Sequence, residues 1–284
     1  MNNVLFDAPG PRTQARHRLY AVVASAALAG LAALAVWRMW DTGQLAYEQW
    51  EPLATPVYIG ALLEGLLQTL AMAFLSILFA VVFGLVFGVG KMSDQAWLRW
   101  PSWVVVEFFR AVPLLLLIIF IFFTFGVGGG IGSFWSVVIG LTLYNGSVLA
   151  EVFRAGVNAV PRGQSEAAYA IGMRKSQVMN LVLLPQAVKI MLPAIISQCV
   201  VALKDTSLGF YIIAPGLTAV GRGIWIQFGN QFQVVIVVSA LYIAANLVLT
   251  WVATWVQHKF VGEKKPLEVM TVGSAASGAS QGGI

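Results

Sequence analysis

The chain has 284 residues, of which 59% are hydrophobic and only 10% are charged, and its formal net charge is +5. Soluble domains carry about 25% charged residues, so the composition excludes a soluble globular protein and indicates an integral membrane protein. One cysteine and two widely separated histidines exclude a disulfide framework and a His- or Cys-based metal site.

Long apolar stretches predict the membrane spans. A helix needs about 20 apolar residues to cross a hydrocarbon core of about 30 Å. The uncharged stretch 111–150 is too long for one helix, and the glycine cluster at 126–132 divides it. In chain order, the expected spans are 19–40, 65–90, the part of 111–150 before the glycines, 134–157, 186–204 and 232–257. We therefore predict an all-α membrane protein with about six transmembrane helices.

The basic residues fall on one side of the membrane if these spans alternate. They occupy the segments before the first span, between the second and third, between the fourth and fifth, and after the sixth. The 41–60 segment on the opposite side has three acidic residues and no base. The excess of Lys and Arg predicts that both termini and the loop 161–185 are cytoplasmic. The net positive charge therefore comes from basic residues in the cytoplasmic segments of a protein in the lipid bilayer, and we expect no nucleic-acid partner.

The loop 161–185 has the pattern of a docking element. Pro161 and Gly163 end the fourth span, two helical turns with small alanines follow, and Gly172 interrupts them before a second polar piece. An ordinary cytoplasmic loop bounded by prolines is the alternative interpretation. The residues that we predict to couple the chain to a partner are Gly163, Glu166, Ala167, Ala168, Gly172, Arg174 and Pro185.

The spacing of Glu166-Ala167-Ala168, Gly172 and Leu184-Pro185 resembles the signature loop of the membrane subunits of ATP-binding-cassette (ABC) importers. Further stretches resemble the polar amino-acid permeases of this class, namely 66–70, 106–115, 144–147, 150–154 and 202–208. The segments 4–11 and 43–52 resemble actinobacterial glutamate-uptake permeases. The resemblance implies a five-helix type I importer core at 61–258 that carries a cytoplasmic coupling helix. An extra N-terminal helix (19–40) and two cytoplasmic tails (1–18 and 259–284) lie outside that core.

The resemblance also implies a function. The chain would be the permease subunit of an ATP-driven amino-acid importer in a bacterial plasma membrane, with glutamate as the expected substrate, moved by alternating access. It would hold no cofactor and catalyse no reaction, because ATP and Mg²⁺ would be bound by a partner ATPase. Its expected partners are two ATPase subunits, an extracellular amino-acid-binding protein, and a second permease chain, for which we favour a different chain over a copy of this one.

Polar residues inside apolar spans are costly, so each is a candidate for the substrate pathway. The predicted pathway residues are Gln68, Thr69, Asn145, Ser147, Glu151, Lys204, Asp205, Thr206 and Ser207. Helix capping and hydrogen bonding between helices explain several of them equally well. The pairs Glu107–Arg110 and Glu151–Arg154 have i,i+3 spacing and can form ion pairs on one helix face.

Other classes of protein fit less well. A permease for another polar amino acid remains open, as does an ATP-independent secondary transporter, although no internal repeat of the kind such transporters carry is evident. The sequence around Gly90-Lys91 lacks the first glycine and the Ser/Thr of a phosphate loop, so we do not expect this chain to bind ATP through such a loop.

Gly84 and Gly88 form a GxxxG pattern, which is typical of close helix packing or of a dimer contact.

Overall fold

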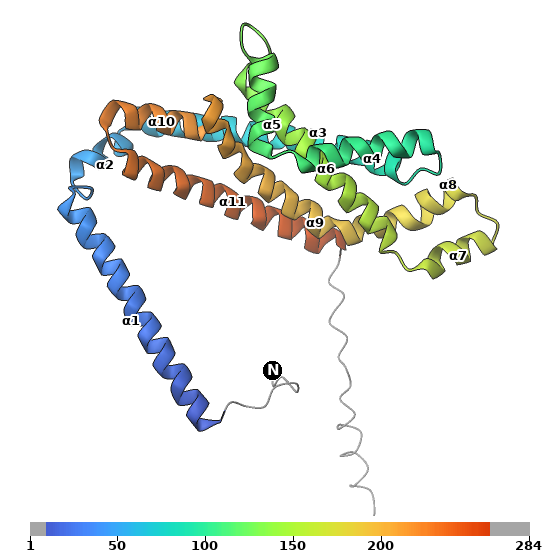
Figure 1. Ribbon diagram of the computed structural model, residues 1–284, viewed down its shortest axis with the longest axis horizontal. Coiled ribbons are helices and arrows are strands. Elements are labelled where there is room, and N and C mark those ends of the chain that lie inside the picture. Colours follow the sequence, from blue (N-terminus) through green and yellow to red (C-terminus); the bar gives the residue numbers. More distant parts are fainter. Residues whose placement is uncertain (1–9, 262–284) are drawn as a thin grey trace, which may run out of the picture. The chain divides into compact units, whose positions relative to one another are not determined.

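The computed structural model describes residues 10–261, and every regular element in that range is a helix (Figure 1). The prediction of an all-α protein is therefore confirmed. The elements are α1 (Pro11–Asp41), α2 (Tyr47–Ala54), α3 (Pro56–Lys91), α4 (Ala96–Ala111), α5 (Leu114–Ile121), η1 (Phe122–Gly126), α6 (Gly132–Asn158), α7 (Arg162–Ala170), α8 (Lys175–Gln177), η2 (Val178–Leu183), α9 (Leu184–Asp205), η3 (Thr206–Ile212), α10 (Leu217–Phe228) and α11 (Gln231–Val261).

The two predicted tails fall largely beyond this range. Residues 11–18 belong to α1 and residues 259–261 belong to α11. The rest of both tails, residues 1–9 and 262–284, lies outside the described residues, and so does most of the N-terminal segment 4–11 that resembles glutamate-uptake permeases.

Among residues 10–261, five helices are long and apolar enough to cross a membrane, which accounts for five of the predicted spans. A sixth span exists if α4 and α5–η1 are counted together, although their axes meet at 101°. The predicted start of the third span at 111 differs from the structure, because Ala111 ends α4 and Leu114 begins α5. Pro113 explains the break: it cannot donate a backbone hydrogen bond, and it holds Val112 in an extended conformation (φ −76°, ψ 128°).

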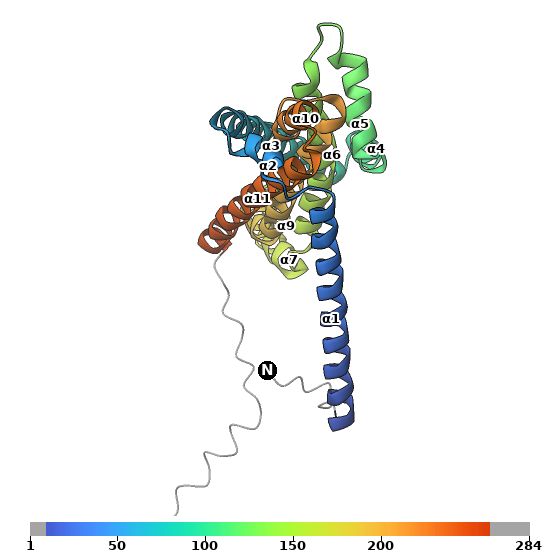
Figure 2. The same cartoon turned by 90° about the vertical axis from the view of Figure 1, so that its left-hand side faces the viewer.

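The chain forms two compact units. The first comprises the residues up to Leu66 together with Gly216–Ala240. Figure 2 shows its α1 as one long helix, and the side chains along it are exposed. The short helix α2, which the sequence analysis did not predict, contacts α10. Two buried amide side chains hold the segment around α2 to the start of α11. Gln233 donates to the carbonyl oxygen of Gln44 (2.7 Å), and Asn230 donates to that of Gln49 (2.9 Å).

The second unit, Leu67–Pro215 with the residues from Leu241, is built around α6. This helix packs against α4, α5 and α9, and its apolar side chains form a core with Met72 and Ile118. A Cβ on Gly84 would lie 2.8 Å from the Cβ of Leu149, and one on Gly88 would lie 3.1 Å from the carbonyl oxygen of Ala150. The GxxxG pattern thus serves close packing of α3 on α6 within the chain, where a side chain would not fit.

Candidate functional site

The predicted docking loop folds as a helical hairpin (Figure 1). Its first helix, α7, covers nine residues, and its second, α8, continues through η2 into α9. The predicted helix, break and second polar piece are therefore present. Gly163 lies in the first turn of α7, Arg174 is the residue before α8, and Pro185 lies in the first turn of α9.

Gly172 closes α7 with a Schellman motif. Its N–H donates to the carbonyl oxygen of Tyr169 (2.9 Å), and the N–H of Met173 donates to that of Ala168 (3.2 Å). The φ of Gly172 is +82°, and no atom lies within 4 Å of where a Cβ would stand. The backbone conformation, and not lack of space, is therefore what requires glycine at this position.

One face of α7 is free to meet a partner. Gly163, Glu166 and Ala167 are exposed, whereas Ala168 is buried against the chain's own residues. Small side chains around one exposed carboxylate leave a surface that another protein can approach closely. Ala168 therefore anchors the helix, and its neighbours form the outward surface.

A second contact holds the hairpin to the rest of the unit. The Nζ of Lys175, in α8, is bonded to the carboxylate of Asp94, in the turn between α3 and α4. This hydrogen bond and the accompanying positive charge hold the pKa of the Asp94 carboxyl below its usual value. The sequence analysis did not find this contact, because 81 residues separate the two partners.

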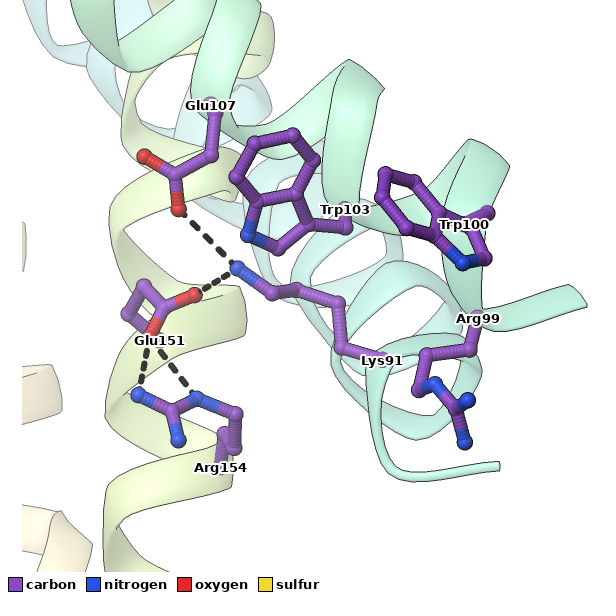
Figure 3. Close-up of a pocket in the computed structure, with 7 residues that line it drawn as sticks. All are labelled: Lys91, Arg99, Trp100, Trp103, Glu107, Glu151 and Arg154. Atoms are coloured by element: carbon purple, nitrogen blue, oxygen red, sulfur yellow. Dashed lines mark hydrogen bonds and ion pairs between the residues drawn. The ribbon is translucent and has the colours of Figure 1, made fainter. Parts of the chain in front are cut away.

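A network of ion pairs joins α3, α4 and α6 (Figure 3). Lys91, at the end of α3, bonds both Glu107 of α4 (3.1 Å) and Glu151 of α6. The two predicted pairs are confirmed, with Arg110 at 3.4 Å from Glu107 and Arg154 at 2.9 Å from Glu151. The sequence analysis did not predict that Lys91 pairs with Glu107 and Glu151.

Glu151 is thus held by two bases and does not join the other predicted pathway residues. Asn145, buried on the same helix, instead meets Gln198 of α9, whose amide donates to its Oδ1. Asn145 also donates to the carbonyl oxygen of Leu141 (2.9 Å), and Ser147 is buried and donates to that of Leu143 (2.8 Å).

A second cluster of polar side chains surrounds Tyr242 of α11. Its hydroxyl lies 3.4 Å from the Oγ1 of Thr206, and it also shares a hydrogen bond with Thr69 of α3. Thr206 and Thr69 are both buried. Sequence reasoning singled out the two threonines but missed Tyr242, as it missed Gln198. Both could have been found from the sequence, because each places a polar group within an apolar span, as the charged residues do.

The remaining predicted pathway residues are less enclosed. Gln68 is half-buried on α3. Lys204 is exposed near the end of α9, and Asp205 and Ser207 beside it are half-buried. The structure thus brings Asn145 together with Gln198, and both threonines with Tyr242.

The described residues thus combine several candidate membrane spans with an exposed helix–glycine–helix hairpin, which defines a multi-spanning helical membrane protein. The chain matches the family described as binding-protein-dependent transport system inner membrane component over residues 80–262. This match covers more than half of the chain, so the protein belongs to that family. It is a multi-pass permease subunit of an ABC importer for amino acids. It is non-catalytic, and ATP binding belongs to a separate ATPase.

Two relatives and one solved structure illustrate the similarity. The glutamate transport system permease protein GluD of Corynebacterium glutamicum is 40% identical over 222 residues, which is 76% of this chain and 81% of that protein. The arginine transport system permease protein ArtQ of Bacillus subtilis is 31% identical, over 72% of this chain and 95% of that protein. A crystal structure of an amino acid ABC transporter with histidines superposes with a TM-score of 0.68 at 28% identity, covering 73% of this chain and 97% of that chain.

Proposed function

We propose that this permease carries glutamate into a bacterial cell, with energy taken from an ATPase that docks on the α7–α8 hairpin. The observation that carries the docking is the exposed helix–Gly172–helix arrangement, in which Glu166 and Ala167 face outward. Support for glutamate comes from the 40% identity to a glutamate permease. The second candidate substrate class is another polar amino acid, which the similarity to an arginine permease favours.

The complex would contain two ATPase subunits, because each permease chain has one such hairpin and two chains would enclose the pathway. The second chain would be a different permease subunit, with a second copy of this chain as the alternative. An extracellular binding protein would deliver the amino acid. The five-helix core would be 61–258, which includes the coupling loop 161–185, and the extra helix 19–40 would precede it.

The orientation that we propose has both termini and the hairpin in the cytoplasm, on the plasma membrane of a bacterium. Cysteine labelling with an impermeant reagent in a Cys199→Ser background tests it. A cysteine at Thr55 should react from outside the cell, and one at Ser176 should react only after permeabilisation. The reverse pattern would overturn the orientation.

The pathway residues that we propose offer hydrogen bonds more than charge. Asn145, Gln198, Thr206 and Tyr242 carry amides and hydroxyls within the spans, where they now bond to one another in pairs. Glu151, which would repel an anionic substrate, is already neutralised by Lys91 and Arg154. Such a passage gives little discrimination by charge, so selectivity would lie mainly in the binding protein.

Proteoliposome uptake of a panel of amino acids tests the substrate, with and without the cognate ATPase and binding protein. Uptake of glutamate that requires both partners is the expected result. Exchanging the binding protein for one of another specificity should move the substrate range with it. A range that stays unchanged after the exchange, and shifts only in Asn145→Ala, would identify the permease itself as the filter.

Gly172→Val tests the coupling. A β-branched residue resists the left-handed conformation, at a cost of about 1–2 kcal/mol, so the hairpin should lose its shape. We expect Gly172→Val to abolish transport-coupled ATPase activity while the chain still inserts into the membrane. Gly172→Asn is the matched control, since asparagine tolerates this conformation, and it should retain most of the activity. Wild-type transport by the valine variant would refute the docking role.

A further inference from the structure

Three helices line a pocket that includes four members of the ion-pair network. Its volume is about 510 Å³, and it opens between the end of α3, the helix α4 and the lower part of α6 (Figure 3). The residues that line it are Lys91, Arg99, Trp100, Trp103, Glu107, Glu151 and Arg154. We call it the Trp–Arg pocket.

The charge around the Trp–Arg pocket is positive. Glu151 is paired with Lys91 and Arg154, and Glu107 with Lys91 and Arg110, so the two carboxylates are shared among three bases. Arg99 adds a fourth positive charge. Its guanidinium donates to the carbonyl oxygens of Ser93 (3.2 Å) and Asp94 (3.4 Å). Neither bond is to a carboxylate, although the Asp94 carboxylate interacts with the Arg99 charge. That carboxylate is itself bonded to Lys175, so the bases around the pocket still outnumber the acids.

The tryptophans place this pocket at a membrane surface. The side chains of Trp100 and Trp103 are 62% and 48% exposed, and their rings meet edge to face at 5.9 Å. Trp97, one turn earlier on α4, is also exposed. Tryptophan collects at the headgroup level of bilayers, because its ring is apolar and its N–H is polar. A row of three on one helix therefore marks α4 as lying at that level.

A second pocket lies next to the first along α4. It measures about 500 Å³, and the residues that line it are all apolar: Phe108, Phe109, Val112, Leu116, Leu117, Phe120, Ile121, Phe125 and Leu143. Glu107 lines the first pocket and Phe108 the second, so the two are neighbours along α4. The bend between α4 and α5 gives this second pocket its concave wall.

We propose that an anionic phospholipid occupies this face. Its phosphate lies against Arg99 and the bases behind it, its glycerol region contacts Trp100 and Trp103, and one acyl chain enters the apolar pocket. Basic pockets between membrane helices bind anionic headgroups in this way. A helix of a second permease chain would fill the apolar pocket but would have to bring its own carboxylate to the Trp–Arg pocket. An anionic lipid carries both the negative charge and the apolar chain in one molecule.

Native mass spectrometry of the assembled transporter tests the proposal. The complex is exchanged into micelles that hold equal amounts of phosphatidylglycerol and phosphatidylcholine, and the retained lipids are counted. We expect retained phosphatidylglycerol in the wild type and a loss of about fivefold in Arg99→Gln, since one basic residue near a membrane contributes about 1 kcal/mol. Arg99→Lys keeps the charge and should keep the lipid. Arg12→Gln removes the same charge from α1, outside the pocket, and should leave retention unchanged.

Three results would overturn the proposal. Equal retention of the two lipids would show that charge does not select the occupant. An equal loss in Arg99→Gln and Arg12→Gln would show a general effect of surface charge. Displacement of the lipid by soluble glycerol phosphate at the same concentration would assign the pocket to a free phosphate. Because retention is read without transport, the outcome is separate from the assignment of glutamate.

Discussion

Lys91→Met should destabilise the protein more than any other single change in the ion-pair network. The side chain of Lys91 is only 6% exposed, and its Nζ bonds both Glu107 and Glu151. Methionine keeps much of the apolar stem and removes the ammonium group, with its charge and its hydrogen-bond donors. The variant therefore leaves the carboxylates of Glu107 and Glu151 without the base that they share.

The size of the effect follows from how buried each partner is. Removing one member of a buried ion pair costs about 3–5 kcal/mol, because the other charge stays buried without compensation. Glu151 is 18% exposed but keeps Arg154 at 2.9 Å, whereas Glu107 is 39% exposed and keeps both water and Arg110. We therefore expect a loss near the lower end of the range, about 3 kcal/mol in the free energy of unfolding.

The measurement is unfolding of the purified permease in mixed micelles of increasing denaturing detergent. Arg110→Met is the matched control, since it removes a base from an exposed pair and should cost at most about 1 kcal/mol. Lys91→Met/Glu151→Gln should recover part of the loss, because the uncompensated carboxylate is then neutral. If Lys91→Met costs no more than Arg110→Met, or if the double variant is no more stable than the single, the network does not hold these helices together.

Two further changes test the packing and the hairpin. A Cβ on Gly146 would lie 2.7 Å from a ring atom of Phe83, so Gly146→Ala should lower stability by about 1–3 kcal/mol in the same assay, whereas Gly223→Ala, with nothing within 4 Å, should not. Lys175→Gln should raise the pKa of Asp94 toward its usual value, as followed by carboxyl ¹³C NMR titration. Because the native pKa is lowered, the pair stabilises above the unfolded-state pKa of Asp94 and is lost as the pH falls through the native one. An unchanged Asp94 titration would contradict the pairing.

Local patterns in the sequence predicted the features that depend on neighbouring residues. Length and hydropathy gave the long helices, and i,i+3 spacing gave the pairs Glu107–Arg110 and Glu151–Arg154. Gly172 between two polar helical pieces predicted the hairpin, since glycine is the residue that adopts a left-handed helix end without strain. Each of these predictions needs only a few consecutive residues.

Contacts between distant residues were beyond such patterns. Lys91 reaches Glu151 across 60 residues, and Gln198 reaches Asn145 across 53. The periodicity of one helix does not say which face of another helix it meets, so the partners could not be paired from the sequence. The 101° bend before α5 has a visible local cause in Pro113, but its angle depends on packing against α6.

The short α5–η1 segment also has a consequence for the lipid around the protein. Its 13 residues, Leu114–Gly126, extend only about 20 Å, against a hydrocarbon core of about 30 Å. The exposed glycines at 128 and 129 that follow carry backbone amides that water must reach. If α5–η1 crosses the bilayer without α4, we expect the surrounding bilayer to thin at this edge, and hydrophobic mismatch there should make the permease sensitive to the chain length of its lipids.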